Sequence, residues 1–282
     1  MENIIKIEFD SEFFNVKDTL ECGQVFRFIP YKLGYKVFTL NKCCYCYNTD
    51  NLAVIECLDK DVEYFKNYFD LSRDYSAIYN SALKETDILS KSAKLGMGIR
   101  LLNQDPAETL FSFIVSQNNN IPRIKGIIEK LCASLGEKST QFNDTYYTFP
   151  TISRMAKENE EFYKSIGLGY RAEYIRRLAV DIANGLNLAD FVTLDTPSLK
   201  RRLLGIFGVG PKVADCVLLF GFKRSDSFPV DTWIEKVYKE NFKGELKNRE
   251  KISKYFTDRF KENSGYYQQY LFYYKRSLEK EN

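Results

Sequence analysis

The start of the chain carries short apolar and aromatic runs rather than a helical repeat. Residues 26–28, 35–38 and 53–55 are rich in aromatic and β-branched side chains, and turn residues such as Pro30 separate them. Runs of this length between turn residues are typical of β-strands. Connections this short favour antiparallel pairing. We therefore expect an antiparallel sheet over residues 1 to about 58.

The apolar spacing becomes helical after residue 60. Val62 and Phe65 begin a pattern with apolar positions three to four residues apart, and the pattern continues to about residue 95. A Gly-Met-Gly sequence at 96–98 interrupts it, and helical patterns dominate afterwards. We therefore expect two domains, a sheet with helices over residues 1–98 and a helical domain over residues 99–282.

The helical half contains clear start and stop signals. A proline at the first helical position follows Asp105, and the nearly all-apolar helix there ends in the amide-rich residues 117–120. Short helices are expected over 151–166 and a long one over 266–278. The polar stretch 136–144 is expected to be a connection.

The stretch with the strongest chemical signal lies at about 197–222. An apolar helix leads into Gly208-Val209-Gly210, and a new helix opens on Pro211 and Lys212. Such a turn leaves backbone N–H groups free, and with a helix N-terminus behind them they can bind phosphate. A lone Gly-x-Gly also fits a simple corner between helices. The flanking helices, the proline and the lysine together favour a helix-hairpin-helix that holds DNA phosphate without reading sequence.

Lys212 and Asp231 each have a structural and a chemical interpretation. Lys212 lies in the first helical turn, where the macrodipole disfavours a cation, so it is either a tolerated exposed lysine or a neutral amine. Burial and a helix N-terminus favour the uncharged amine, which is a nucleophile toward carbon. Asp231 is a good N-cap for the helix after Pro229. The same carboxylate is suited to stabilise positive charge on a sugar or to move protons.

Two other clusters are less informative. The amides of residues 117–120 either form a polar turn or point toward base edges, and their spacing does not separate the two. Cys43, Cys44 and Cys46 lie in a predicted strand without a second ligand pair, so we favour strand packing over metal binding.

Composition narrows the chemistry further. The 282 residues include no histidine, which excludes Ser-His-Asp and Cys-His nucleophilic systems and histidine-ligated zinc. A lysine or a carboxylate must therefore carry any acid–base step. A net charge of +3 permits nucleic-acid binding but is weak evidence for it.

Cellular placement also follows from the sequence pattern. The seven cysteines are an odd number, which favours reduced thiols. Neither a signal peptide nor an apolar run of membrane length is recognised. We therefore expect a cytoplasmic protein (nucleoid-associated in a bacterium or archaeon) or a nuclear one in a eukaryote.

Several segments together resemble the 8-oxoguanine DNA glycosylase/AP lyase family of the helix-hairpin-helix, Gly/Pro-rich loop, Asp superfamily. The signature segments are GVGPKVADC, which contains Lys212, and PVD, which contains Asp231. The other matching segments, in chain order, are GQVFRF, LNQDPAETLFSFIVSQNNNIPRI, SIGLGYRAEYI and YYQQYLF. The resemblance implies an α+β fold with an N-terminal antiparallel, TBP-like β-sheet and helices. This part packs on an all-helical glycosylase domain, and DNA binds in the cleft between them.

The resemblance also implies an activity. The protein would be a bifunctional enzyme that flips 8-oxoguanine out of duplex DNA, excises it and then cleaves the abasic site by β-elimination. Lys212 would attack C1′ to form a Schiff base, and Asp231 would support base loss. No redox cofactor or catalytic metal is implied, and the hairpin carbonyls are a candidate site for a structural cation. The implied partner is double-stranded DNA, bound by a monomer without a membrane.

The remaining site residues are implied by the same resemblance, position by position. The lesion base would lie between Phe272 and Cys216, with Gln268 on its Watson–Crick edge. The Gly23 carbonyl would accept the N7–H that 8-oxoguanine has and guanine lacks. The residues that would hold the opposite base or wedge into the gap are Asn118, Arg123, Tyr170 and Arg171. Those that would hold a DNA phosphate are Gly208, Val209 and Gly210.

Trp233 departs from the family pattern, because eukaryotic members carry a histidine two positions after the aspartate. An indole stacks or donates one hydrogen bond but does not titrate near neutral pH. Two alternative functions are a glycosylase of the same superfamily for alkylated bases and a non-enzymatic DNA-structure-binding protein. Lys212 argues against the first, whose members usually activate water instead, and Lys212 with Asp231 argues against the second.

Overall fold

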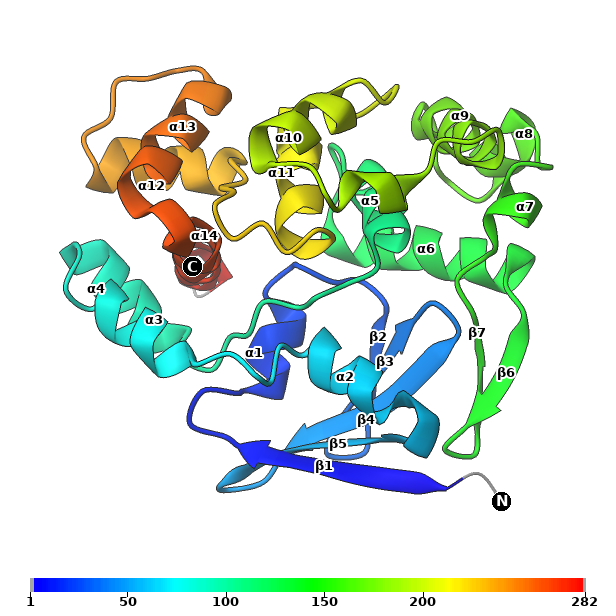
Figure 1. Cartoon of the computed structure of the whole chain (residues 1–282), viewed down its shortest axis with the longest axis horizontal. Coiled ribbons are helices and arrows are strands. Elements are labelled where there is room, and N and C mark those ends of the chain that lie inside the picture. The colour runs from blue at the N-terminus through cyan, green and yellow to red at the C-terminus, as the bar shows by residue number, and fades with distance from the viewer. Residues whose placement is uncertain (1–2, 281–282) are drawn as a thin grey trace.

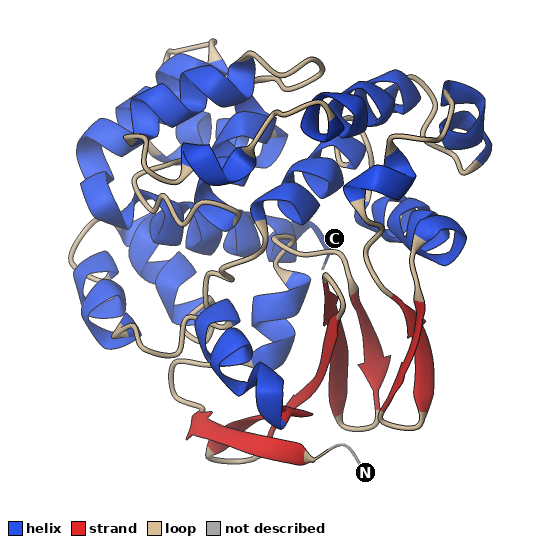
Figure 2. Cartoon of the chain, turned by 45° about the vertical axis from the view of Figure 1, so that its right-hand side comes forward, coloured by secondary structure: helices blue, strands red, loops and turns tan. Residues whose placement is uncertain are grey.

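A computed structural model describes residues 3–280 of the chain. Its N-terminal part is a five-stranded antiparallel sheet in the order β1-β5-β4-β3-β2. The sheet lies on one side of the molecule and most helices lie on the other (Figures 1 and 2). This arrangement confirms the expected α+β fold. The strands are β1 (Ile4–Asp10), β2 (Phe28–Tyr31), β3 (Gly34–Thr39), β4 (Lys42–Asn48) and β5 (Leu52–Leu58).

Two of the three strand runs are confirmed, and the third is displaced. Runs 35–38 and 53–55 lie within β3 and β5. The run 26–28 was placed too early, because β2 begins only at Phe28 and continues through Pro30, which we expected to form a turn. Proline lacks the N–H that a central strand needs, but β2 is an edge strand, where one side stays unpaired.

The helices of the first hundred residues divide between two cores. α2 packs under the sheet with Phe65 and Tyr68, whereas α3 and α4 contribute Tyr75 and Leu89 to the core of the helical half. The rings of Tyr75 and Tyr266 meet edge to face at 5.6 Å between centroids. These elements are α1 (Val16–Glu21), η1 (Asp59–Asp61), α2 (Val62–Tyr68), α3 (Tyr75–Ala82) and α4 (Asp87–Leu95).

The remaining helices form the larger core and include the helix-hairpin-helix α10–α11. The short helices expected over 151–166 are α7 and α8, and the long C-terminal one is α14. The elements are α5 (Pro106–Val115), α6 (Ile121–Leu135), α7 (Ile152–Met155), α8 (Glu160–Ser165), α9 (Arg171–Ala183), η2 (Leu188–Phe191), α10 (Thr196–Leu204), α11 (Pro211–Phe220), α12 (Thr232–Asn241), α13 (Arg249–Phe260), η3 (Lys261–Asn263) and α14 (Ser264–Lys280).

A second, two-stranded sheet replaces much of the connection expected over 136–144. β6 (Lys138–Gln141) and β7 (Asp144–Tyr147) pair as an antiparallel hairpin. Its two turn residues have φ of +54° and +58°, as tight hairpin turns require. The hairpin lies against the first sheet, where Gln141 Nε2 donates to the Cys43 carbonyl at 3.0 Å and Asp144 pairs with the buried Lys36 at 2.8 Å.

Buried arginines tie the two halves together. Arg100 is 1% exposed, and its guanidinium donates to the carbonyls of Phe69 (2.9 Å), Phe13 (3.1 Å) and Asp70. Arg27 of the sheet half pairs at 3.0 Å with Glu108 of α5, and both side chains are buried. Within residues 3–280, no helix combines the length and apolar character needed to cross a bilayer.

Candidate active site

The turn between α10 and α11 is tightly built. Gly208 has a φ of +83°, in the left-handed region that favours glycine. Its carbonyl accepts a hydrogen bond from Gln117 Nε2 at 2.9 Å. The Val209 N–H already donates to the Ile206 carbonyl at 3.0 Å. The donors that remain for an anion are therefore the N–H groups of Gly208 and Gly210 and those of Lys212 and Val213 in the first turn of α11.

Replacing Gly208 with alanine is expected to lower the free energy of unfolding by about 1–3 kcal/mol. A Cβ there would lie 2.7 Å from Tyr174 Cδ2, in addition to the unfavourable φ. The matched control is Gly210→Ala, because a Cβ at Gly210 meets no atom within 4 Å. Its loss should be smaller, about 0.5–1 kcal/mol, because alanine is a poorer N-cap than glycine. Denaturant unfolding of both variants checks this, and equal losses would contradict it.

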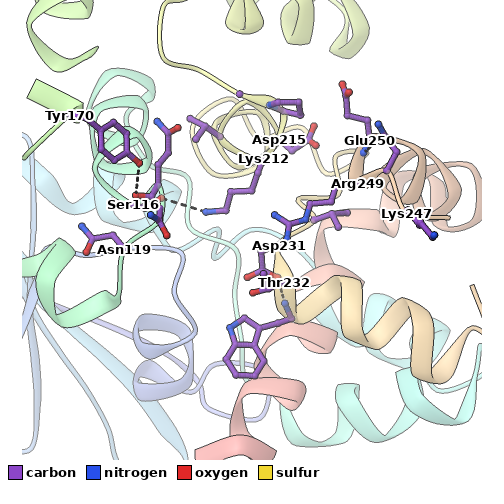
Figure 3. A pocket seen from close by; sticks show the side chains of 18 residues that line it. Ser116, Asn119, Tyr170, Lys212, Asp215, Asp231, Thr232, Lys247, Arg249 and Glu250 are labelled. Atoms are coloured by element: carbon purple, nitrogen blue, oxygen red, sulfur yellow. Dashed lines mark hydrogen bonds between the residues drawn. The ribbon is translucent and has the colours of Figure 1, made fainter. Parts of the chain in front are cut away.

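Lys212 extends from the first turn of α11 toward the end of α5. Its ammonium lies 3.4 Å from Ser116 Oγ and 5.2 Å from the centroid of the Phe113 ring. Figure 3 shows the side chain pointing across the pocket toward Ser116. Neither Ser116 nor Phe113 was singled out from the sequence. Their contact with Lys212 depends on the packing of α5 against α11, which no local pattern reveals.

Asp231 is the N-cap of α12, as expected. Its Oδ1 accepts the N–H groups of Trp233 and Ile234, both at 3.0 Å. Burial raises the pKa of Asp231, while these two N–H groups and the charges of Lys212 and Arg249 act to lower it. Asp231 can therefore cap α12 and still serve as a carboxylate in the site, because both capping bonds use Oδ1 and leave Oδ2 outside the cap.

A cleft of about 930 Å³ contains both residues. Asn118, Tyr170 and Gly210 line the same cleft, so the structure brings together five of the site residues suggested by the sequence. Two cations that the sequence analysis passed over, Lys247 and Arg249, lie across the cleft from Ser116 (Figure 3). The available signal was their position on either side of Asn248, which caps α13.

A smaller pocket of about 50 Å³ adjoins Lys212 and Asp231. It unites all four of the residues suggested for the lesion base, although they come from opposite ends of the chain: Gly23, Cys216, Gln268 and Phe272. The pocket is smaller than a purine, and Phe272 lies close against Gly23.

Two side chains determine what the small pocket presents to a ligand: Gln268 has an amide oxygen that is unpaired among residues 3–280, and Cys216 has a thiol. Gln268 is 5% exposed, and its Oε1 has no hydrogen-bond partner within the described chain. An unpaired buried acceptor is unfavourable unless a ligand supplies a donor. Burial raises the pKa of Cys216 to about 12, despite the opposing charge of Lys212. Cys216 is therefore a neutral thiol in the wall of the pocket.

Of the residues suggested for the opposite base, Asn118 and Tyr170 line the wide cleft, whereas Arg123 and Arg171 do not. Tyr170 is 52% exposed and Asn118 has a φ of +45°. Arg123 Nη2 donates to the Gly167 carbonyl at 3.3 Å. Arg171 is 3% exposed, and its guanidinium donates to the carbonyls of Gln117 and Asn118. In this structure Arg171 supports the turn that carries Asn118.

Within residues 3–280, no cluster of three or more Cys, Asp or Glu side chains is arranged to hold a metal ion. All seven cysteines are buried and free. Cys43, Cys44 and Cys46 lie in β4, where Cys44 and Cys46 join the core beneath the sheet.

Family models match nearly the whole chain. The model described as "8-oxoguanine DNA glycosylase, N-terminal domain" matches residues 6–110. The model described as "HhH-GPD superfamily base excision DNA repair protein" matches residues 111–262. The two models meet inside α5, between residues 110 and 111.

Individual relatives agree with the family models. A probable N-glycosylase/DNA lyase of Methanothermobacter thermautotrophicus is 31% identical over 78% of this chain and 75% of its own. The N-glycosylase/DNA lyase of Saccharomyces cerevisiae is 32% identical over 80% and 67%.

Solved structures extend the similarity to the fold. The Clostridium acetobutylicum 8-oxoguanine glycosylase/lyase, in complex with double-stranded DNA containing cytosine opposite 8-oxoguanine, superposes with a TM-score of 0.92. It is 35% identical and covers 98% of both chains. The Archaeoglobus fulgidus 3-methyladenine DNA-glycosylase, at 18% identity and a TM-score of 0.79, shares the fold. The chain belongs to the 8-oxoguanine DNA glycosylase/lyase family of the helix-hairpin-helix base-excision repair superfamily.

Proposed function

We propose that the protein excises 8-oxoguanine from duplex DNA and then cleaves the strand at the abasic site by β-elimination. One observation carries this proposal. Lys212 and Asp231 line both a wide cleft and a small adjoining pocket, and in that pocket Gln268 has a buried oxygen without a partner. A nucleophile, a carboxylate and a site for one base therefore share the same space.

Recognition requires the base to leave the duplex, because an enzyme cannot reach a glycosidic bond inside the stack. In the pocket, Gln268 Oε1 would accept from the N1–H or N2–H of the base. The Gly23 carbonyl would accept the N7–H of 8-oxoguanine, whereas guanine presents a lone pair there. Phe272 and Cys216 would cover the two faces of the ring. The loss from one mismatched buried acceptor is about 1–3 kcal/mol.

The chemistry follows from Lys212 and Asp231, the two residues that would meet the sugar. As the glycosidic bond breaks, its electron pair leaves with the base, and Asp231 stabilises the positive charge that develops on the sugar. The amine of Lys212 attacks C1′ and passes a proton to the ring oxygen as the bond between C1′ and that oxygen breaks, which gives a protonated imine. Loss of a proton from C2′ then expels the 3′ phosphate and breaks the strand. We propose no cofactor for these steps, since each uses only an amine and a carboxylate.

DNA would be held from several sides of the cleft. Gly210 and the first turn of α11 would bind a backbone phosphate, and Lys247 and Arg249 add positive charge on the opposite wall. Tyr170 would wedge into the gap left by the flipped base, and Asn118 with Arg123 would meet the base opposite. We propose that one chain acts alone on one lesion.

The test is reductive trapping. The purified protein is incubated with duplex DNA containing one 8-oxoguanine, in the presence of borohydride. A covalent protein–DNA complex is expected, together with release of 8-oxoguanine, because borohydride reduces the imine to a stable amine. Binding without an adduct would contradict the lyase assignment. Repeating the assay with each of the four opposite bases measures the preference that Asn118 and Arg123 impose.

A further inference from the structure

Gly23 lies in a part of the backbone that no regular element supports. It falls between α1 and β2, in a segment without helix or strand. Its φ is +91°, and a Cβ built on it would lie 3.2 Å from Phe272 Cε1. Under the proposed function its carbonyl must meet a single N–H of the lesion. N–H···O hydrogen bonds are confined to about 2.7–3.2 Å, so something must fix this carbonyl in place.

Gln24 holds the backbone on one side of Gly23. Its side chain is completely buried. Its Nε2 donates to the carbonyls of Thr19 at 2.9 Å and Arg100 at 2.7 Å, and its Oε1 accepts the N–H of Leu102 at 2.8 Å. Its own backbone carbonyl accepts from Gln104 Nε2 at 2.8 Å. One amide thus fastens the peptide after Gly23 to α1 and to the segment that joins the two halves.

Gln269 holds the backbone on the other side. It is 2% exposed, and its Nε2 donates to the Cys22 carbonyl at 2.9 Å. Gln269 follows Gln268 on α14, and both line the small pocket. The hydrogen bond to Cys22 therefore sets the distance between the helix that carries Gln268 and the peptide that carries Gly23. Gln269 and Cys22 are 247 residues apart in the sequence but are joined here by one hydrogen bond.

We propose that Gln24 and Gln269 are positioning residues that hold the Gly23 carbonyl at the distance from Gln268 that an 8-oxoguanine base requires. This inference rests on the proposed function and deepens it. Selectivity for the lesion depends on two buried amides beside the base-reading groups, in addition to those groups themselves. Loss of either amide should impair recognition of the base and leave the amine chemistry of Lys212 intact.

The test compares two reactions within each variant. Release of 8-oxoguanine from a duplex needs the base pocket, whereas cleavage of a duplex with a preformed abasic site needs Lys212 but no base. Gln269→Met keeps the size of the side chain and removes the hydrogen bond to Cys22. We expect the single-turnover rate of 8-oxoguanine release to fall at least about tenfold. The rate on the abasic duplex should stay near that of the wild type.

Gln141 offers a matched control on the far side of the sheet. It is also buried, at 7% exposure, and its Nε2 donates to the carbonyl of Cys43 at 3.0 Å. Gln141→Met removes the same kind of bond, so it reports general destabilisation and should leave the ratio of the two rates unchanged. An unchanged ratio in Gln269→Met would overturn the proposal. An equal fall of the ratio in Gln141→Met would overturn it as well.

Gln24→Met extends the test to the other side of Gly23, with a larger expected effect because three bonds are lost. If this variant does not fold, Gln269→Met decides alone. Failure of the proposed function would look different, because the wild type itself would cleave abasic DNA without releasing 8-oxoguanine. That result would overturn both proposals, whereas an unchanged ratio in Gln269→Met overturns only the positioning role.

Discussion

Replacing Lys212 with glutamine is expected to abolish the borohydride-trapped adduct and to slow strand cleavage at 8-oxoguanine by about 10³-fold or more, since removal of a catalytic nucleophile typically has effects of this size or larger. The amide nitrogen of glutamine is not a nucleophile and forms no imine. Glutamine keeps most of the aliphatic part of the side chain, and the Lys212 bond to Ser116 is long at 3.4 Å, so the packing of α11 on α5 should persist. Single-turnover assays on the lesion duplex and on a preformed abasic site measure the effect.

The control for this variant is Lys251→Gln. Lys251 is exposed on α13 and does not line the cleft. Lys251→Gln removes one positive charge, as Lys212→Gln does, so a general loss of DNA affinity should appear in both variants. Only Lys212→Gln should lose the covalent adduct. A Lys212→Gln protein that cleaves the lesion strand at the wild-type rate would contradict the nucleophilic role.

Replacing Asp231 with asparagine is expected to slow base release by about 10²–10³-fold, the size of effect seen when one preorganised electrostatic group is removed from an active site. Asparagine caps helices about as well as aspartate, so the bonds to Trp233 and Ile234 should remain. The stability of the protein should therefore change little. Base release from saturated single-turnover complexes and thermal unfolding separate the two effects.

The same variant gives a pH test. Burial raises the pKa of Asp231 above its ordinary value. Because the charged form is the one required, base release should fall as pH drops through this raised pKa, at milder acidity than for an exposed aspartate. Asp231→Asn should lack that acidic decline.

Asp195→Asn is the matched control for Asp231→Asn, because Asp195 is also the N-cap of a helix. It is exposed at the start of α10 and accepts the N–H of Ser198 at 2.8 Å, but it does not line either catalytic pocket. Asp195→Asn should leave base release and its pH profile unchanged. Wild-type base release by Asp231→Asn would show that the carboxylate acts only as a cap.

The sequence predicted those parts of the site that residues adjacent in the chain specify. The Gly-Val-Gly turn with Pro211 and Lys212 is a contiguous pattern, and Asp231 is marked by the proline before it and the helix after it. Both patterns identify groups whose conformation depends on their neighbours in the chain. The fold class followed for the same reason, since strand and helix periodicities are local.

The features that were missed depend on contacts distant in sequence. Ser116 meets Lys212 only because α5 packs on α11, and Gln269 reaches Cys22 only because α14 returns to the start of the chain. The β6–β7 hairpin was missed for a different reason. Its polar residues resemble a loop, and they form strands because the turn at Asn143 adopts a left-handed conformation and the first sheet lies beside them.

The buried arginines between the two halves have a mechanical consequence. Arg100 is bound to backbone carbonyls of Phe13 and Phe69, and Arg27 is paired with Glu108 in the same interface. Moving the halves relative to each other would break these bonds in a low-dielectric interior, so the two halves should keep a fixed arrangement when a duplex binds. The deformation must then fall on the DNA, and smooth bending of a short duplex by 40–90° requires roughly 1–6 kcal/mol. We therefore expect affinity to rise with the flexibility of the base steps flanking the lesion.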